Sequence, residues 1–64
     1  MLRAECIRIK NLVLDCQFRV YEDFVNNMEE VDYLEHAYLN GVDIAHVITE
    51  EFKEELIEEY KNNL

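Results

Sequence analysis

The chain has 64 residues, of which half are hydrophobic, with one glycine, no proline and a formal net charge of −9. A sequence of this length forms a single small domain, expected to span residues 1–64, and its hydrophobic content excludes an intrinsically disordered protein. It has no apolar run long enough to cross a membrane and too few cysteines for a disulfide framework, so we expect a soluble, reduced, cytoplasmic protein.

The charge is distributed unevenly along the sequence. Residues 1–21 contain four basic and two acidic side chains, whereas residues 22–64 contain two basic and thirteen acidic side chains. An acidic surface of this density repels nucleic acid and anionic membranes and attracts basic proteins. We therefore expect no direct nucleic-acid binding, no membrane binding, and a partner protein with a basic surface.

Residues 12–21 predict a β-strand with one buried face, because every second residue is apolar and most of the others are polar. The apolar set comprises Leu12, Leu14, Cys16, Phe18 and Val20. Upstream, Ile7 and Ile9 alternate in the opposite phase. The backbone must therefore bulge or turn at Lys10–Asn11, which leaves a bent strand and a short hairpin as alternatives. The mostly polar residues 22–30 are expected to form the next connection.

Residues 24–40 are compatible with either a helix or a strand. A helix that ends at Asn40–Gly41 would align the side chains of Phe24, Met28, Val31, Leu34 and Tyr38. In the alternative, Asn40–Gly41 forms a two-residue hairpin turn, for which this dipeptide is a strong signal. The opposed residues are then Leu39 with Val42, Ala37 with Ile44, and Glu35 with His46.

We favour the hairpin because it gathers a nearly continuous apolar face. The side chains on that face are Val31, Tyr33, Ala37, Leu39, Val42, Ile44 and Ile48. The opposite face carries Asp32, His36, Tyr38 and Asp43. Of the aromatic residues, Tyr33, Phe52 and Tyr60 are interpreted as core, whereas Tyr38 lies beside Asp43 at an expected contact surface.

Thr49 is expected to cap a C-terminal helix, because its hydroxyl suits the N-cap position and Glu50 and Glu51 suit the first turn. The apolar stripe of this helix comprises Phe52, Leu56, Ile57, Tyr60 and Leu64. The predicted fold is therefore an α+β layer, in which a small antiparallel sheet of three or four strands packs against one C-terminal helix.

The hairpin and the helix contain a run of residues on which a resemblance to other proteins rests. These residues are Leu39, Asn40, Gly41, Val42, Asp43, Ile44, Val47, Ile48, Thr49, Glu50, Glu51, Glu54, Leu56 and Glu58. The run resembles a group of small acidic phage-encoded proteins, in which a Leu-Asn-Gly-Val-Asp-Ile hairpin precedes a Glu-rich helix. The resemblance implies a phage origin and this fold, and it supplies no catalytic residue.

Cys6, Cys16, His36 and His46 are residue types that bind zinc, but they lack the short spacings of zinc motifs. The predicted hairpin also points the two histidines to opposite faces. Nucleophilic catalysis would need a cysteine beside a histidine in a cleft that excludes water, and so small a sheet leaves little room for one. We therefore expect no enzyme, no catalytic residue, no metal site and no cofactor.

The acidic residues of the helix form two rows. Glu50, Glu54 and Glu58 make one row, Glu51, Glu55 and Glu59 make the other, and successive carboxylates lie about 6 Å apart. Each like-charged pair at i,i+4 costs about 0.2–0.5 kcal/mol. Two interpretations remain open. The glutamates form an ordinary solvated face, which tolerates this repulsion, or they form a row of negative charges that mimics the phosphates of a nucleic acid. The predicted partner-binding residues are Tyr38, Asp43, Glu50, Glu51, Glu54, Glu55, Glu58 and Glu59.

The acidic helix predicts a non-enzymatic binding protein, and the resemblance implies that it is of phage type and acts in the host cytoplasm. It would bind and modulate a basic host protein, with the acidic helix acting as a nucleic-acid mimic. The alternative is a structural or oligomerisation module, in which an edge strand within residues 5–21 pairs with the same strand of a second copy to form a homodimer.

Overall fold

The computed structural model describes residues 1–23, 25 and 28–63. Four strands form one antiparallel sheet in the order β1-β2-β3-β4, and one helix follows them. The elements are β1 (Leu2–Ile9), β2 (Leu12–Asp23), β3 (Met28–Leu39), β4 (Val42–Asp43) and α1 (Glu50–Asn62). The predicted α+β fold is confirmed.

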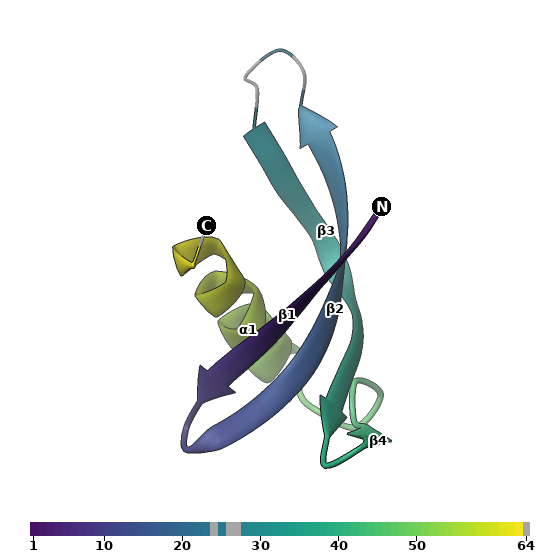
Figure 1. The fold of residues 1–64 in the computed structure, drawn as a ribbon, viewed down its shortest axis with the longest axis vertical. Coiled ribbons are helices and arrows are strands. Elements are labelled where there is room, and N and C mark those ends of the chain that lie inside the picture. The colour runs from purple at the N-terminus through teal and green to yellow at the C-terminus, as the bar shows by residue number, and fades with distance from the viewer. Residues whose placement is uncertain (24, 26–27, 64) are drawn as a thin grey trace.

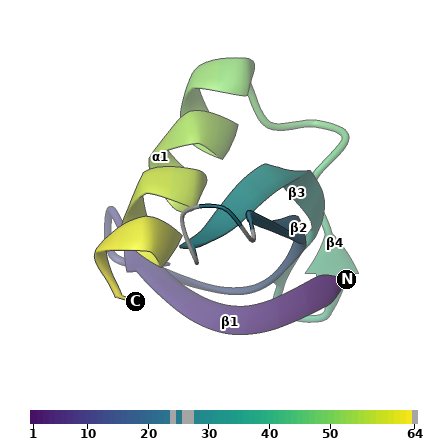
Figure 2. The same ribbon diagram turned by 90° about the horizontal axis from the view of Figure 1, so that it is seen from above.

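The helix covers one face of the sheet, and the other face is left uncovered by the described chain (Figures 1 and 2). In Figure 1, β1 crosses in front of β2, and α1 lies behind the sheet. The long β2–β3 hairpin projects beyond both, which gives the molecule an elongated shape of 37 × 19 × 19 Å. We call the sheet surface against α1 the inner face and the opposite surface the outer face.

Two tight turns determine the antiparallel topology. Lys10 and Asn11 have φ values of 51° and 64°, and Asn40 and Gly41 have φ values of 52° and 83°. Two successive residues with positive φ form the type of turn whose twist matches a β-hairpin. Of the two alternatives at Lys10–Asn11, the structure has the short hairpin and not the bent strand. The expected Asn40–Gly41 hairpin is confirmed.

The core lies between β2 and α1. Leu14, Cys16, Phe18 and Val20 are at most 2% exposed, which confirms the predicted buried face of β2 except at Leu12, which is partly buried. The other buried residues are Ile7, Leu34, Ala37, Ala45, Leu56 and Tyr60. Phe52 and Ile57 of the predicted helical stripe pack against this core, and Leu64 lies outside the described residues.

β3 is a strand, so the helical alternative for this segment is wrong, but its inward-facing residues differ from those predicted. Tyr33 is 47% exposed, and Leu34 occupies the core in its place. The register between β2 and β3 shifts twice, which leaves Glu35 and Asp32 without an opposed residue on β2. Each such bulge inserts one residue and reverses the alternation of the following side chains.

The connection between β2 and β3 is shorter than predicted. β2 continues to Asp23 and β3 begins at Met28, so much of the expected connection over residues 22–30 is strand. Phe24, which supported the helical alternative, lies outside the described residues.

The last strand is also shorter than predicted. Leu39 lies opposite Val42, and the Ile44 N–H donates to the Ala37 carbonyl oxygen at 2.7 Å, as the hairpin requires. β4 ends at Asp43, so the expected pairing of Glu35 with His46 is wrong. The Asp43 carboxylate accepts a hydrogen bond from the Ala45 N–H at 3.0 Å, which turns the chain away from the sheet. Val42 is 62% exposed and does not join the apolar face.

Thr49 caps α1 as predicted. Its side-chain hydroxyl accepts a hydrogen bond from the Phe52 N–H at 3.0 Å. Thr49→Ala should lower the free energy of unfolding by about 1 kcal/mol, because this N–H loses its acceptor. Thr49→Ser keeps the acceptor and serves as the matched control. Urea denaturation of both variants checks the expectation, and equal losses would show that the cap is not the cause.

Candidate partner-binding site

The first candidate surface is the acidic side of α1 that points away from the sheet. Leu56 and Tyr60 face the core, and the opposite side of the helix exposes Glu50, Glu51, Glu54 and Glu58. Glu50 accepts a hydrogen bond from the Lys53 ammonium at 3.1 Å, yet 87% of its side chain remains exposed. We call these four residues the acidic row.

The other predicted glutamates are used differently. Glu55 forms an ion pair with the Lys10 ammonium at 2.9 Å, and the same ammonium lies 5.4 Å from the centre of the Phe52 ring. This contact joins α1 to the β1–β2 turn. Glu59 is half-buried. The second row of glutamates is therefore not a continuous solvated track.

Arginines on two strands are paired with acids outside the acidic row. Arg3 pairs with Glu29 at 3.1 Å, and Arg19 pairs with Glu35 at 3.3 Å. As a result, the described chain places no cation on Glu51, Glu54 or Glu58. These three glutamates therefore contribute unpaired negative charge to a chain whose net charge is already −9.

The second candidate surface lies on the outer face of the sheet, at the β3–β4 hairpin. The His36 ring nitrogen Nδ1 lies 2.7 Å from Asp43 Oδ2, and the His36 and Tyr38 rings stack with centres 5.7 Å apart. The other Asp43 oxygen accepts hydrogen bonds from the Ala37 and Ala45 N–H groups at 3.2 and 3.0 Å. Hydrogen bonds from the Ala45 N–H and from His36 lower the pKa of Asp43 from 3.8 to about 2. Asp43 is therefore a fixed carboxylate that holds the hairpin together.

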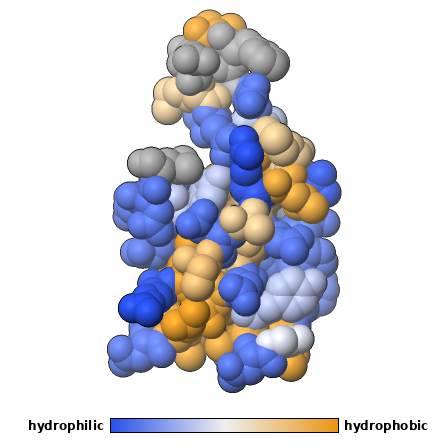
Figure 3. All heavy atoms as spheres, viewed as in Figure 1, coloured by the Kyte–Doolittle hydropathy of each residue, from blue (hydrophilic) through white to orange (hydrophobic). Residues whose placement is uncertain are grey.

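Tyr38 also lines an open hollow on the outer face. The hollow is formed by Ala4, Glu5, Cys6, Asp15, Cys16, Gln17 and Tyr38. Figure 3 shows the molecule from the viewpoint of Figure 1, with hydrophobic residues scattered between hydrophilic ones over the lower half. Cys6 is exposed, whereas burial, with the nearby Asp15 charge, raises the pKa of the Cys16 thiol to about 11. Cys16 therefore stays a protonated core residue at neutral pH.

The predicted site residues do not converge. The acidic row belongs to α1 on the inner side of the sheet, whereas Tyr38 and Asp43 belong to the outer face. One flat partner surface cannot contact both groups. Asp43 is also engaged by His36 and by two backbone N–H groups, so its role in the structure is local.

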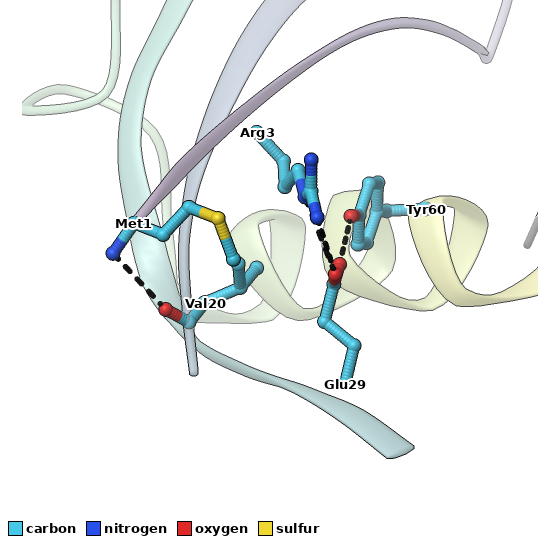
Figure 4. Close-up of polar contacts among 5 residues, drawn as sticks. All are labelled: Met1, Arg3, Val20, Glu29 and Tyr60. Atoms are coloured by element: carbon cyan, nitrogen blue, oxygen red, sulfur yellow. Dashed lines mark hydrogen bonds and ion pairs between the residues drawn. The ribbon is translucent and has the colours of Figure 1, made fainter. Parts of the chain in front are cut away.

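A cluster around Glu29 was not predicted from the sequence (Figure 4). The Tyr60 hydroxyl donates to Glu29 Oε1 at 2.7 Å, and Arg3 donates to Oε2 from two nitrogens at 3.2 and 3.1 Å. Burial and the bond to Glu29 raise the pKa of Tyr60 to about 12, so the hydroxyl remains a donor. The Tyr60 ring stacks on Phe18 with centres 4.5 Å apart. These residues join β1, β3 and α1. They are far apart in the sequence, so no local sequence pattern could predict their contacts.

Comparisons with known proteins assign no family. No protein-family model, no curated protein and no solved structure matches the chain. Across the described ranges, no helix is both long and apolar enough to span a membrane. Nor do three or more histidine, cysteine or acidic side chains gather there in a way that would hold a metal ion. The function must therefore be argued from the two surfaces themselves.

Asp43 predicts a component of stability that depends on pH. Because its pKa is lower in the folded protein, the ionised form stabilises the fold above pH 3.8, and this contribution is lost as the pH falls to about 2. Asp43→Asn should be less stable than the wild type at neutral pH, and the difference should shrink toward about pH 2. Urea denaturation at several pH values measures both proteins. A difference that stays constant over this range would contradict the assignment.

Proposed function

We propose that the chain is a small non-enzymatic protein that binds a basic surface of another protein through the acidic row of α1. The observation that carries the proposal is the exposure of Glu51, Glu54 and Glu58 with no cation bound to them within the described chain. The Glu55 ion pair with Lys10 and the packing of Leu56 and Tyr60 hold the helix in one orientation. The acidic row is therefore presented on a rigid support.

The spacing of the row suits a groove that binds nucleic acid. Residues four apart on a helix lie about 6 Å apart along its axis, which is close to the separation of phosphates along one strand. Basic side chains that line such a groove attract phosphates, and they attract a row of carboxylates at a similar spacing for the same electrostatic reason. We propose that the partner is a nucleic-acid-binding protein, and that the chain occupies its groove as a mimic.

The proposed setting is the cytoplasm of a host cell, with the chain acting as a phage-type modulator of a host protein. The support is the resemblance of residues 39–58 to small acidic phage proteins. Binding of this kind requires no catalytic residue and no cofactor. Tyr38 and Asp43 lie on the opposite side of the sheet and are not part of the proposed interface.

Charge reversal in the acidic row tests the proposal. Glu54→Lys combined with Glu58→Lys should abolish retention of the partner from bacterial lysate, because the row then repels basic side chains. The wild-type complex should dissociate as the salt concentration rises. Immobilised protein, washed with increasing salt and analysed by mass spectrometry, measures both effects.

The matched control reverses two exposed acids on the sheet. Glu22→Lys combined with Asp32→Lys changes the net charge by the same amount but leaves α1 intact. This control should retain the partner. If both double variants lost binding equally, the change in net charge alone would explain the loss. Unchanged binding of the partner by the helix variant would disprove the proposal. Circular dichroism of both variants checks that they are folded.

A further inference from the structure

β1 is a long edge strand, and no other strand of the described residues lies along its outer side. It occupies one edge of the sheet with eight residues, whereas β4 at the other edge has two. Long edge strands present unpaired backbone groups that bind another strand, and very short ones do not. In Figures 1 and 2, the N-terminal half of β1 runs away from α1. The backbone of this half is therefore open to a second chain.

The hydrogen bonds of β1 show which backbone groups are free. Met1 and Val20 exchange two hydrogen bonds, at 2.9 and 3.3 Å. Hydrogen-bonded pairs recur at every second residue of an antiparallel ladder, so Arg3, Glu5 and Ile7 are bonded to β2. The N–H and C=O groups of the alternate residues point away from β2, toward the open edge. In the open half of the strand these residues are Leu2, Ala4 and Cys6.

The side chains of these three residues are exposed on the outer face. Leu2 is 45% exposed, and Ala4 and Cys6 are also exposed. They are apolar or weakly polar in a chain whose surface is otherwise strongly acidic. The side chains of Arg3 and Glu5 lie between them on the inner face, where Arg3 reaches Glu29. The open half of β1 therefore has an apolar outer side and one charge of each sign on its inner side.

We propose that β1 pairs antiparallel with β1 of a second copy of this chain, with the two-fold axis at Ala4. In this register Ala4 lies opposite its own copy, and Leu2 lies opposite Cys6. Three hydrogen-bonded pairs then contribute about six backbone hydrogen bonds. Arg3 of each copy lies opposite Glu5 of the other, in a pair that is not hydrogen-bonded through the backbone and whose side chains are close.

Charge selects this register over its neighbours. Directly opposed residues must share a face, so the axis passes through a single residue of β1. An axis at Glu5 places two glutamates opposite each other, and an axis at Arg3 does the same for two arginines. An axis at Cys6 places both charges opposite isoleucines. Only the axis at Ala4 forms two ion pairs, and it joins two sheets into one of eight strands.

Single charge reversals test the pairing through the mass of the protein in solution. The wild type should sediment as a dimer in analytical ultracentrifugation. Glu5→Arg should raise the Kd of the dimer about tenfold or more, because each opposed pair then holds two arginines. Asp32→Lys, which makes the same change of charge at an exposed residue of β3 far from the edge, should leave the dimer intact and serves as the control. A wild type that is monomeric at all concentrations, or a dimer that is insensitive to Glu5→Arg, would overturn the proposal.

Mixing two weakened variants gives a sharper test. A homodimer of Arg3→Glu would place the new glutamate at position 3 of each copy opposite Glu5 of the other, so this variant should also dissociate. An equimolar mixture of Arg3→Glu and Glu5→Arg restores both ion pairs, so native mass spectrometry should show a heterodimer in excess of either homodimer. Absence of the heterodimer from a mixture of two folded variants would rule out the register. Circular dichroism checks the fold first, because Arg3 also bonds Glu29.

Cysteine cross-linking tests the register without changing any charge. Ala4→Cys in a Cys6→Ser background places two thiols opposite each other, at a Cα separation that a disulfide spans. Mild oxidation should convert this variant into a covalent dimer, while the buried Cys16 stays unreacted. Leu2→Cys in the same background is the control, because its two copies lie about 13 Å apart along the strands. Cross-linking of the control, or its absence at position 4, would overturn the assignment.

Discussion

The structure depends on the contact between the buried face of β2 and the apolar stripe of α1. Phe18 and Tyr60 stack at the centre of this contact, and Leu56 is fully buried beside them. A chain of 64 residues buries a smaller share of its surface than a larger domain does, so a few large side chains carry much of the stabilisation. The sheet without the helix would leave this face in water, and the helix alone would be too short to be stable.

The same contact determines which glutamates reach the solvent. Because Leu56 and Tyr60 must face the sheet, the side of α1 that carries Glu50, Glu54 and Glu58 must face away from it. The Lys10 ion pair with Glu55 then ties one flank of the helix to the β1–β2 turn. The concentration of negative charge on one surface thus follows from core packing and from the pairing of Arg3, Lys10 and Arg19 with other acids.

Most of the fold was predictable because its signals are local. Alternation identified β2 and its buried face, Asn40–Gly41 identified a hairpin, and Thr49 identified the start of the helix. The errors concern β3, where an extra residue at a bulge reverses which side chains face the core. The bulges at Asp32 and Glu35 turned Tyr33 outward, and no local pattern marks them.

For the candidate site, the sequence identified the acidic helix but could not separate its rows, because the Glu55 partner is Lys10, far away in the chain. It also grouped Tyr38 and Asp43 with that helix, although the sheet separates them. The order of the elements in the chain has a consequence for synthesis. Residues 1–43 of the sheet leave the ribosome before α1, so the inner face stays without its cover until the helix emerges. During this interval the nascent sheet exposes both its apolar face and its β1 edge, the two kinds of surface that make a partly folded chain prone to aggregation.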